Sequence, residues 1–558
     1  MWLSRQHPSQ QDHGSFYASD ATLSFTTSRE EPVWWDLRQI SDSELKKLSS
    51  RNPVIVSVSD ELLEHDGNAE VHRTDADGTV LQTDYFRADG TRHLSDRRDV
   101  NTPGSLGGRK ITAFDRKGHA VGQWSSLRAL YHCWVDWVVG DEESIMIIDS
   151  AHTGGLFFDY QREHVTTVQV IHTHHMRQMR SDDRGKLDPD VMKMLTHLDW
   201  YDGVAVLTNR QQNDLIGAGV IQDNSFVAPN MLVGAPESPP IERDGRRGVI
   251  AARLSGVKRL QHAIRAMGKV READPEVRLD VYGTGVKEKM LRSLVSELDV
   301  SENVTLRGYD PHAREQFRSA SFTLLTSVYE GQGLVLLEAM AAGCVPIAYD
   351  IEYGPSDIIT DGVDGFLVPN GDVNALARAI ARLATLGDLE LETMRRAAIK
   401  RSQDFSPASI SQLWTENLAE IRKRKRVVGK AKVQASLAGI TMDDDGTSFT
   451  IDITSSEATD QIQGVWITWM GRGRNAFGRV KARVMAQRDT VRAEARIDSD
   501  RLSDVDETTL LDVHVDVLGA STLTRSRVAT EDASMPTGGS GFVPYSTAHG
   551  NLSIKYVR

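Results

Sequence analysis

The stretch SVYEGQGLVLLEAMAAG, residues 327–343, decides how the rest of the chain is interpreted. It follows an apolar run over residues 322–326 that is typical of a buried parallel strand. A glycine-rich turn comes next, followed by an apolar helical pattern that stops at Gly343, a residue suited to the left-handed position after a helix. A turn of this kind can bind an anion, because it frees backbone N–H groups and the helix start adds a partial positive charge.

Two glutamates, Glu330 and Glu338, bracket this turn. If Glu330 lies on the loop and Glu338 lies one turn into the helix, both can face one crevice. Taken alone, the stretch is equally compatible with an ordinary strand-to-helix turn that has a glutamate on each side.

The bulk properties describe a globular protein of 558 residues, 40% of them hydrophobic, so we expect three or four domains. Two cysteines, Cys133 and Cys344, allow no disulfide framework, which favours a reducing compartment. We find no spanning apolar run and no signal peptide, so we expect a protein in the cytoplasm or at the inner face of the membrane. The net charge of −13 argues against nucleic acid as a partner, and a polyanionic substrate would need a local basic groove.

Three changes of pattern divide the chain. Strand-like pieces with Asp-Gly turns predict an antiparallel meander before residue 128, because such turns suit hairpins. Strands then alternate with helices over two successive segments, which is typical of α/β domains, and short alternating strands follow. The predicted parts are an irregular N-terminal segment 1–50, a β-meander 51–128, an N-terminal Rossmann-like domain 129–235, a linker 236–247, a C-terminal Rossmann-like domain 248–405, a crossover helix 406–425 and a β-sandwich 426–558.

Two cations, Arg253 and Lys258, follow the first strand of the second α/β segment. We expect them at the carboxyl edge of the sheet, where open α/β sheets bind ligands, and both side chains suit phosphate. A solvated basic loop is the alternative. Gly283 and Gly285 end the next strand, where a glycine lets a ligand approach the backbone, although the pair alone is weak evidence.

Histidines end another predicted strand, at His172, His174 and His175. Three interpretations stay open for them. Their spacing suits a metal site, but no acidic cluster or cysteine pair accompanies them. His172 could instead donate a hydrogen bond to a substrate in the crevice, or it could be a packed residue at a strand end.

Together, the Arg253–Lys258 pair, the Glu330-x7-Glu338 spacing and the glycine turn resemble retaining glycosyltransferases of the GT-B fold, family four, over residues 140–425. The resemblance implies a donor site on the second α/β domain. It implies that Arg253 and Lys258 hold the diphosphate, that backbone N–H groups of the turn hold phosphate and sugar hydroxyls, and that Glu338 binds the ribose. It predicts as catalytic residues Glu330, His172, Arg253 and Lys258, and as donor-binding residues Arg253, Lys258, Gly283, Gly331, Gln332, Gly333, Leu334 and Glu338.

The meander is similar to the insertion of bacterial teichoic-acid glycosyltransferases. The resemblance therefore implies transfer, with retention and without a metal, of glucose or N-acetylglucosamine from a UDP-sugar to a poly(alditol phosphate) wall teichoic acid. The alternatives are a protein O-glycosyltransferase of adhesins, a nucleotide-sugar 2-epimerase and a non-catalytic glycopolymer-binding protein. Such enzymes begin with a strand and a Gly-Gly loop, and residues 1–50 show neither. Peripheral membrane association and homo-oligomerisation stay open.

Overall fold

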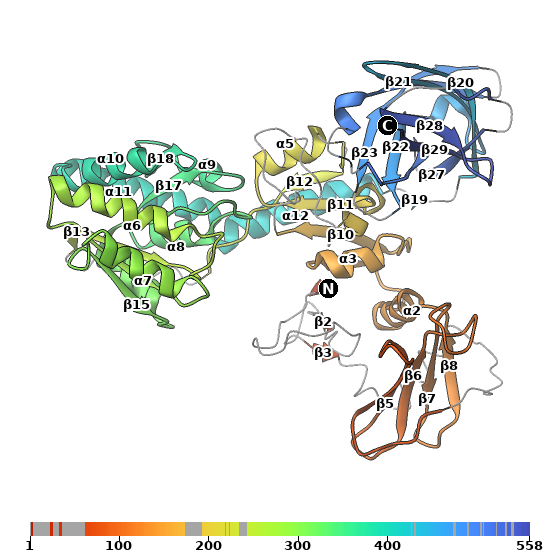
Figure 1. Cartoon of the computed structure of the whole chain (residues 1–558), viewed down its shortest axis with the longest axis horizontal. Coiled ribbons are helices and arrows are strands. Elements are labelled where there is room, and N and C mark those ends of the chain that lie inside the picture. The colour runs from red at the N-terminus through yellow and green to blue at the C-terminus, as the bar shows by residue number, and fades with distance from the viewer. Residues whose placement is uncertain are drawn as a thin grey trace. The chain divides into compact units, whose positions relative to one another are not determined.

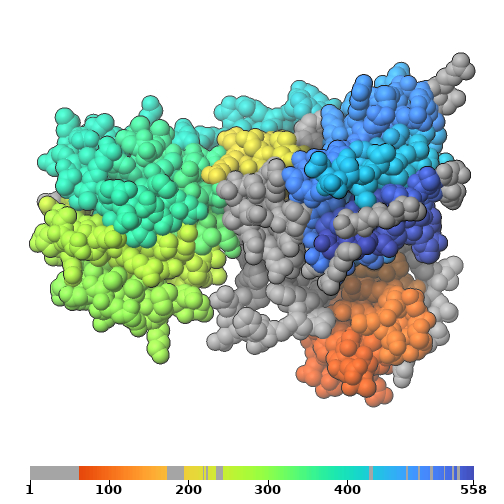
Figure 2. All heavy atoms as spheres, turned by 45° about the horizontal axis from the view of Figure 1, so that its top comes forward, coloured from red at the N-terminus to blue at the C-terminus, as the bar shows by residue number. Residues whose placement is uncertain are grey.

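The computed structural model divides into two compact units, residues 1–170 and 171–558. Its elements are labelled in Figure 1 and its surface is shown in Figure 2. The residues that the structure describes are 2–3, 23–25, 33–35, 62–172, 192–217, 219–221, 224–233, 243–425, 427–428, 431–472, 476–487, 490–502, 505, 507–520, 522–530, 533–536 and 541–557.

An antiparallel five-stranded sheet dominates the described part of the first unit, and it confirms the predicted meander. The Asp-Gly turns predicted between its strands do carry positive φ angles, 82° at Gly78 and 78° at Gly90. Neighbours in sequence are neighbours in the sheet, and short turns join them except between β6 and β7, where the connection runs over residues 98–109. The strands are β4 (Glu70–Thr74), β5 (Val80–Phe86), β6 (Arg92–Arg97), β7 (Lys110–Phe114) and β8 (Ala120–Trp124).

A buried carboxylate, Asp99, holds the β6–β7 connection of this sheet. It accepts hydrogen bonds from Arg73 at 2.9 Å, from Arg97 at 2.8 Å and from the backbone N–H of Gly104 at 2.8 Å. Burial alone would raise the pKa of Asp99, but these donors, Arg73 foremost, more than offset burial and hold the pKa below its usual value. The ionised form of Asp99 is therefore part of the fold.

The rest of the first unit contains parallel strands with helices. The structure has α2 (Leu127–Val139), β9 (Ser144–Ile148), α3 (Ala151–Phe157) and β10 (Val165–Ile171), and β9 and β10 pair in parallel. The N-terminal segment also contributes a strand, β1 (Trp2–Leu3), which pairs in parallel with β9 through Trp2 and Ile147. The expectation that residues 1–50 contain no strand is wrong on this point. Two residues are too few to show an alternating pattern in sequence.

The second unit begins with smaller elements that complete the α/β pattern. Here α4 (Met192–Leu195) and a 3₁₀ turn over Leu198–Trp200 precede β11 (Gly203–Val206), α5 (Asn209–Gly217) and β12 (Ser225–Val227). Strands β11 and β12 pair in parallel. The strand expected near residues 52–58 lies outside the described residues.

The C-terminal α/β domain is a parallel six-stranded sheet in the order β15-β14-β13-β16-β17-β18. The central strand β16 is buried along its whole length, as its continuous apolar run predicts. The strands are β13 (Asp244–Ala251), β14 (Arg278–Tyr282), β15 (Val304–Gly308), β16 (Ala320–Leu325), β17 (Val345–Asp350) and β18 (Phe366–Pro369). The helices are α6 (Leu260–Ala273), α7 (Glu288–Glu297), the 3₁₀ helix η4 (Ala313–Arg318), α8 (Leu334–Ala341), α9 (Pro355–Ile358), α10 (Val373–Ala384) and α11 (Asp388–Ser402).

The crossover helix, α12 (Pro407–Lys423), begins as the sequence predicts. The Ser406 side chain accepts a hydrogen bond from the Ser409 N–H, and Pro407 occupies the first turn, where no N–H is needed. Its face packs on the β11–β12 pair, because a Cβ at Gly203 would lie only 2.6 Å from the Ile421 side chain. Within the described ranges, none of the helices combines the length and the apolar character that crossing a bilayer requires.

The described residues between 427 and 557 form eleven hydrogen-bonded strands around one core, in agreement with the predicted all-β region. Trp469 is buried in that core, whereas Trp466, on the other face of β22, is only partly buried. The strands are β19 (Val427–Val428), β20 (Val433–Asp443), β21 (Gly446–Ser455), β22 (Gly464–Gly471), β23 (Phe477–Lys481), β24 (Arg483–Ala486), β25 (Val491–Asp498), β26 (Leu511–Leu518), β27 (Thr522–Ala529), β28 (Gly541–Ser546) and β29 (Leu552–Val557).

The Asp99 contacts generate a stability prediction. We expect Asp99→Asn to destabilise the meander by about 3 kcal/mol, because it removes the negative partner of two partly buried arginines. The pKa of Asp99 is lowered in the folded state, so its stabilisation is present above its ordinary pKa of 3.8 and is lost as the pH falls below that value. Hydrogen exchange of peptides from residues 70–124 in urea measures both effects.

The matched control is Asp77→Asn, at an exposed position in a hairpin turn. If Asp99→Asn exchanges no faster than this control at pH 7, the stabilising role of Asp99 is refuted.

Candidate functional site

A cleft with a volume of about 300 Å³ opens at the carboxyl ends of β13 and β16. It brings His172, Lys258 and Glu330 together with the glycine turn, although these residues lie far apart in sequence. The full lining is His172, Leu207, Asn230, Ile250, Ala251, Ala252, Lys258, Leu260, Thr323, Leu324, Leu325, Thr326, Ser327, Glu330, Gly331, Gln332, Gly333, Leu334 and Val335.

The glycine turn is held by backbone contacts that leave no room for side chains. Gly333 has a φ of 88° directly before α8, a conformation that favours glycine. A Cβ at Gly331 would lie 2.0 Å from the carbonyl oxygen of His172, and one at Gly354 would lie 1.7 Å from that of Gln332. Only glycine at positions 331 and 354 allows these backbone segments to approach so closely. Gly343, with a φ of 72°, follows the end of α8 in the left-handed conformation, as predicted.

Glu330 is the ionic centre of the cleft. Its Oε1 atom lies 2.5 Å from Lys258 Nζ and also accepts a hydrogen bond of 2.5 Å from the Ser327 hydroxyl. The Glu330 side chain is 15% exposed and that of Lys258 is 29% exposed, so the pair is shielded but reachable from the cleft. The Lys258–Glu330 pair therefore borders the cleft while most of each side chain is shielded from solvent.

Gln332 brings a second polar group to the cleft. Its side chain is 3% exposed, and its Oε1 atom accepts a 2.7 Å hydrogen bond from the backbone N–H of Asn230. This bond assigns the amide orientation and leaves Nε2 as a donor, for which the described residues provide no partner.

Two predicted residues, Arg253 and Gly283, lie outside the lining of the cleft. Arg253 is exposed, and its side chain makes no hydrogen bond or ion pair with the described residues. A Cβ at Gly283 would lie 2.0 Å from the Ala252 carbonyl oxygen, so this glycine permits the 252–254 loop to pack closely. Its contact with a donor stays a prediction.

Glu338 lies one turn into α8, as expected, but it pairs with Arg314 of η4 at 3.1 Å and is not part of the cleft lining. Burial raises the pKa of Glu338, and the Arg314 guanidinium opposes this effect only in part. The ion pair between Glu338 and Arg314 is weakly shielded on its cationic side, because the Arg314 side chain is 73% exposed.

Arg259 is a structural residue of the site that sequence reasoning missed. Its guanidinium donates to the Thr326 carbonyl at 3.0 Å and to the Asn370 side chain at 2.6 Å, and so it fixes the end of β16. Asn370 lies 111 residues further along the chain, so no local pattern could show this contact.

The metal interpretation of the histidines is not addressed by the structure, because His174 and His175 lie outside the described residues. In the parts of the chain that are described, no three His, Cys, Asp or Glu side chains gather in a metal-binding arrangement. The cleft lining includes Glu330 and His172 as residues of metal-binding type, whereas a typical zinc site has three or four protein ligands.

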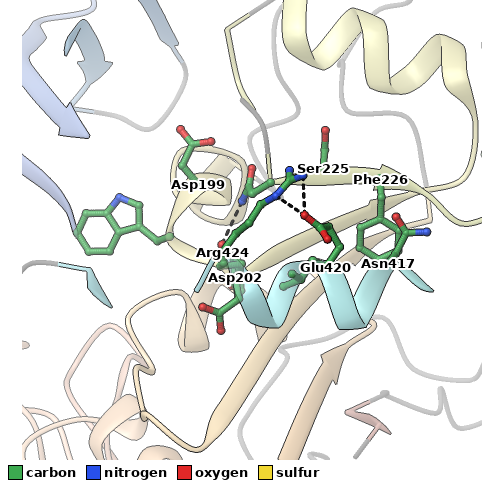
Figure 3. Close-up of a pocket in the computed structure, with 11 residues that line it drawn as sticks. Asp199, Asp202, Ser225, Phe226, Asn417, Glu420 and Arg424 are labelled. Carbon is green, nitrogen blue, oxygen red and sulfur yellow. Dashed lines mark hydrogen bonds and ion pairs between the residues drawn. The ribbon is translucent and has the colours of Figure 1, made fainter. Parts of the chain in front are cut away.

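A second, smaller cavity of about 70 Å³ lies between α12 and the segment around residues 199–202 (Figure 3). Asp199, Asp202 and Glu420 face it, and Arg424 is bound to Glu420. This volume is too small for a sugar unit. We therefore assign the candidate site to the larger cleft.

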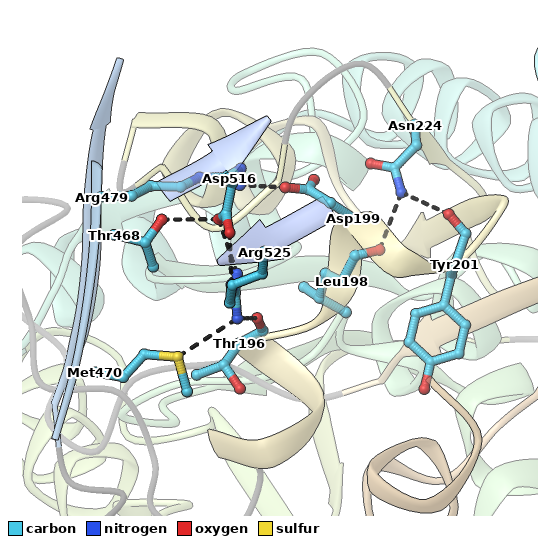
Figure 4. A network of polar contacts seen from close by, with 10 residues as sticks. All are labelled: Thr196, Leu198, Asp199, Tyr201, Asn224, Thr468, Met470, Arg479, Asp516 and Arg525. Atoms are coloured by element: carbon cyan, nitrogen blue, oxygen red, sulfur yellow. Dashed lines mark hydrogen bonds and ion pairs between the residues drawn. The ribbon is translucent and has the colours of Figure 1, made fainter. Parts of the chain in front are cut away.

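Asp199 also joins a buried polar network with the C-terminal sheet region (Figure 4). It binds Arg479, while Arg525 donates to the Thr196 carbonyl at 2.9 Å and to Asp516 at 2.6 Å. Burial would raise the pKa of Asp516, but Arg525 more than compensates and keeps that pKa below its usual value. The network fixes the sheet region to the segment that leads into β11.

The geometry of the cleft agrees with the comparisons to known proteins. Residues 236–403 match the family model described as "Glycosyl transferases group 1". The matched range covers the C-terminal α/β domain and thus the glycine turn, Lys258 and Glu330. The predicted resemblance to glycosyltransferases is confirmed.

Two curated relatives make the likeness more specific. The chain is 25% identical over 338 residues to the poly(glycerol-phosphate) alpha-glucosyltransferase of Bacillus subtilis, which covers 59% of this chain and 49% of that protein. It is 25% identical over 339 residues to the poly(ribitol-phosphate) alpha-N-acetylglucosaminyltransferase of Staphylococcus aureus, with 61% of this chain and 66% of that protein covered. The chain thus spans about half the length of the first relative and about two thirds of the second.

Solved structures confirm the fold. A crystal structure of TarM superposes with a TM-score of 0.53 at 24% identity, covering 62% of this chain and 68% of that chain. A variant of S. aureus TarM in complex with UDP, alpha-GlcNAc-glycerol and Fondaparinux gives a TM-score of 0.52 at 22% identity, covering 71% of this chain and 80% of that chain. The predicted GT-B architecture is therefore confirmed, and the relatives are hexosyltransferases, as the predicted enzyme class requires.

The close approach at Gly331 can be tested by adding one methyl group. We expect Gly331→Ala to lower the melting temperature by several degrees, because its Cβ would force the His172 backbone away at a cost of about 2 kcal/mol. The measurement is thermal unfolding followed by circular dichroism. Gly387→Ala is the control, since a Cβ there meets nothing within 4 Å and the φ of −65° suits alanine. Equal melting temperatures for the two variants would contradict the tight packing of the turn.

Proposed function

We propose that this chain is a retaining glycosyltransferase that moves glucose or N-acetylglucosamine from a UDP-sugar to a poly(alditol phosphate) acceptor of the wall teichoic acid type. The observation that carries the proposal is the meeting of Lys258, Glu330 and His172 with the glycine turn in one cleft. The names of the relatives support the acceptor class, and the UDP complex of a TarM variant supports the donor class.

The reaction breaks the bond between the anomeric carbon and the diphosphate, and UDP leaves with the electron pair. The oxygen of an acceptor hydroxyl forms the new bond to that carbon on the same face, and the hydroxyl proton passes to an oxygen of the departing diphosphate. Negative charge therefore grows on the leaving diphosphate. Fixed positive groups that face this charge lower the barrier without rearranging.

In this proposal the diphosphate lies beside Lys258 and Arg253 and receives N–H groups at the start of α8. Glu330, released from Lys258, faces the donor sugar, and His172 contacts the same sugar. Glu338 binds the ribose after exchange with Arg314. The role requires no metal, because the protein's own cations supply the positive charge.

Screening donors and acceptors tests the function directly. The protein is incubated with UDP-glucose or UDP-N-acetylglucosamine and with poly(glycerol phosphate) or poly(ribitol phosphate), and UDP release is measured. We expect release that depends on one donor and one polymer. Formation of a free epimer without any acceptor would instead identify an epimerase, and the absence of turnover would favour a polymer-binding protein.

Removing the two cations should slow the reaction. We expect Arg253→Ala and Lys258→Ala each to lower kcat about 100-fold, the effect typical of a lost charge-stabilising group. The Arg253 side chain is exposed and has no hydrogen bond or ion pair with the described residues, so its removal should leave the fold unchanged. Steady-state kinetics with Arg265→Ala, an exposed cation on α6, as control provide the measurement. Unchanged turnover in both variants would remove these residues from the mechanism.

The raised pKa of Glu338 predicts an unusual pH dependence of nucleotide binding. The carboxylate form accepts the ribose hydroxyls, so affinity should fall as the pH drops through the pKa of Glu338. Because burial raises this pKa above 4.5, the loss should begin at a higher pH than for an ordinary glutamate. Titration calorimetry of UDP between pH 5 and 8 measures it.

Glu338→Gln corrects this experiment for the titration of UDP itself. The difference between the native protein and the variant isolates the contribution of Glu338. If both proteins show the same pH profile, Glu338 does not bind the ribose in its ionised form.

A further inference from the structure

A polar clasp joins α5 to the segment that follows β17. Arg210 of α5 binds Glu352 and also lies 3.3 Å from Asp350, while the Tyr353 hydroxyl donates to Asp214 at 2.6 Å. We call these five residues the α5 clasp. They belong to one compact unit but are separated by about 140 residues of sequence.

The α5 end of the clasp is firmly placed. The Thr208 hydroxyl accepts a hydrogen bond from the Gln211 N–H and so caps the helix. The Asp357 carboxylate accepts a 2.9 Å bond from the N–H of Asn209, a group that has no partner within the helix. The first turn of α5 is thus fixed by α9 as well as by its own cap.

The opposite end of the clasp holds Glu330 by its backbone. The Glu330 N–H donates to the Glu352 carbonyl at 3.1 Å, and the Tyr353 N–H donates to the Glu330 carbonyl at 2.9 Å. The next residue, Gly354, packs against the Gln332 carbonyl so closely that no Cβ would fit. A shift of residues 352–354 therefore moves Glu330 and the glycine turn with it.

The Tyr353 side chain is suited to rigid positioning. Its ring is 1% exposed, so it cannot change rotamer without opening the core. Burial, and then the Asp214 carboxylate, raise the pKa of Tyr353, so the phenol stays protonated and donates. A hydrogen bond to a charged acceptor is stronger than one between neutral groups.

We propose that Tyr353 and Arg210 are positioning residues that hold Glu330 in its working orientation through the α5 clasp. The inference rests on the proposed function, since it assigns Glu330 to the donor sugar. Neither residue is itself part of the cleft lining, so both act on Glu330 through the 352–354 backbone. The clasp joins α5, which follows β11, to residues 352–353, and these residues bond to the backbone of Glu330. It thus connects the smaller α/β region around β11 and β12 with the C-terminal α/β domain.

Tyr353→Phe tests this inference with the loss of one oxygen atom. We expect kcat to fall about tenfold, less than the roughly 100-fold loss that follows a misplacement of 1 Å. The Kd for UDP should rise by less than kcat falls, because UDP lacks the sugar that Glu330 faces and its diphosphate also lies beside Lys258 and Arg253. Asp214→Asn should behave in the same way. Tyr556→Phe, at a tyrosine of the C-terminal sheet region, is the matched control and should match the native protein.

Hydrogen exchange gives a readout that does not depend on turnover. Peptides that cover residues 326–335 should exchange faster in Tyr353→Phe and not in Tyr556→Phe. A double-mutant cycle tests the ion pair of the clasp with the variants Arg210→Ala and Glu352→Ala. The exchange rate of peptides 326–335 in the double variant should be no higher than in either single variant.

The outcomes separate the two proposals. If the native protein turns over a UDP-sugar and Tyr353→Phe retains kcat within twofold, the clasp has no positioning role. An equal weakening of UDP binding and of kcat would also overturn it. If the native protein turns over no UDP-sugar, the proposed function fails, and exchange of residues 326–335 alone decides whether the clasp holds the loop.

Discussion

Close backbone packing around the glycine turn is the constraint on which the site depends. The Gly331 backbone lies against the His172 carbonyl, and the Gly354 backbone lies against the Gln332 carbonyl. No side chain separates these segments, so their spacing is set by bond geometry and van der Waals contact, which do not yield easily. The direction of the Glu330 side chain follows from this packing, because its own N–H and C=O are both bonded to residues 352–353.

Charge is arranged around this rigid frame in exchangeable pairs. Lys258 pairs with Glu330 in the cleft. Arg314 pairs with Glu338, which lies one turn into α8. In each pair the carboxylate and the cation neutralise one another, so the two pairs add no net charge to this part of a protein whose net charge is −13.

Local signals in the sequence predicted the strands, turns and helices of the site but not the long-range contacts between them. The strand at residues 278–282, the Ser406 cap and the left-handed Gly343 were all predictable, because periodicity and capping depend on neighbouring residues. The same signals placed Glu330 on the loop and Glu338 in the helix. They could not show β1, which is two residues long, nor contacts such as Arg210–Glu352, because contacts across 142 residues depend on the finished fold.

The C-terminal sheet region is linked to the same frame through residues 196–214. Its buried Arg525–Asp516 pair bonds to the Thr196 carbonyl, and Arg479 binds Asp199. Burying such charges adds little net stability compared with apolar packing, because both ions lose their hydration. These charges instead fix the orientation of the residues that they join, because a guanidinium that is bonded on two sides allows only one arrangement of its partners. A few residues later the same stretch of chain forms α5, which holds the loop of Glu330. The all-β region and the cleft are thus joined by a short run of ordered residues.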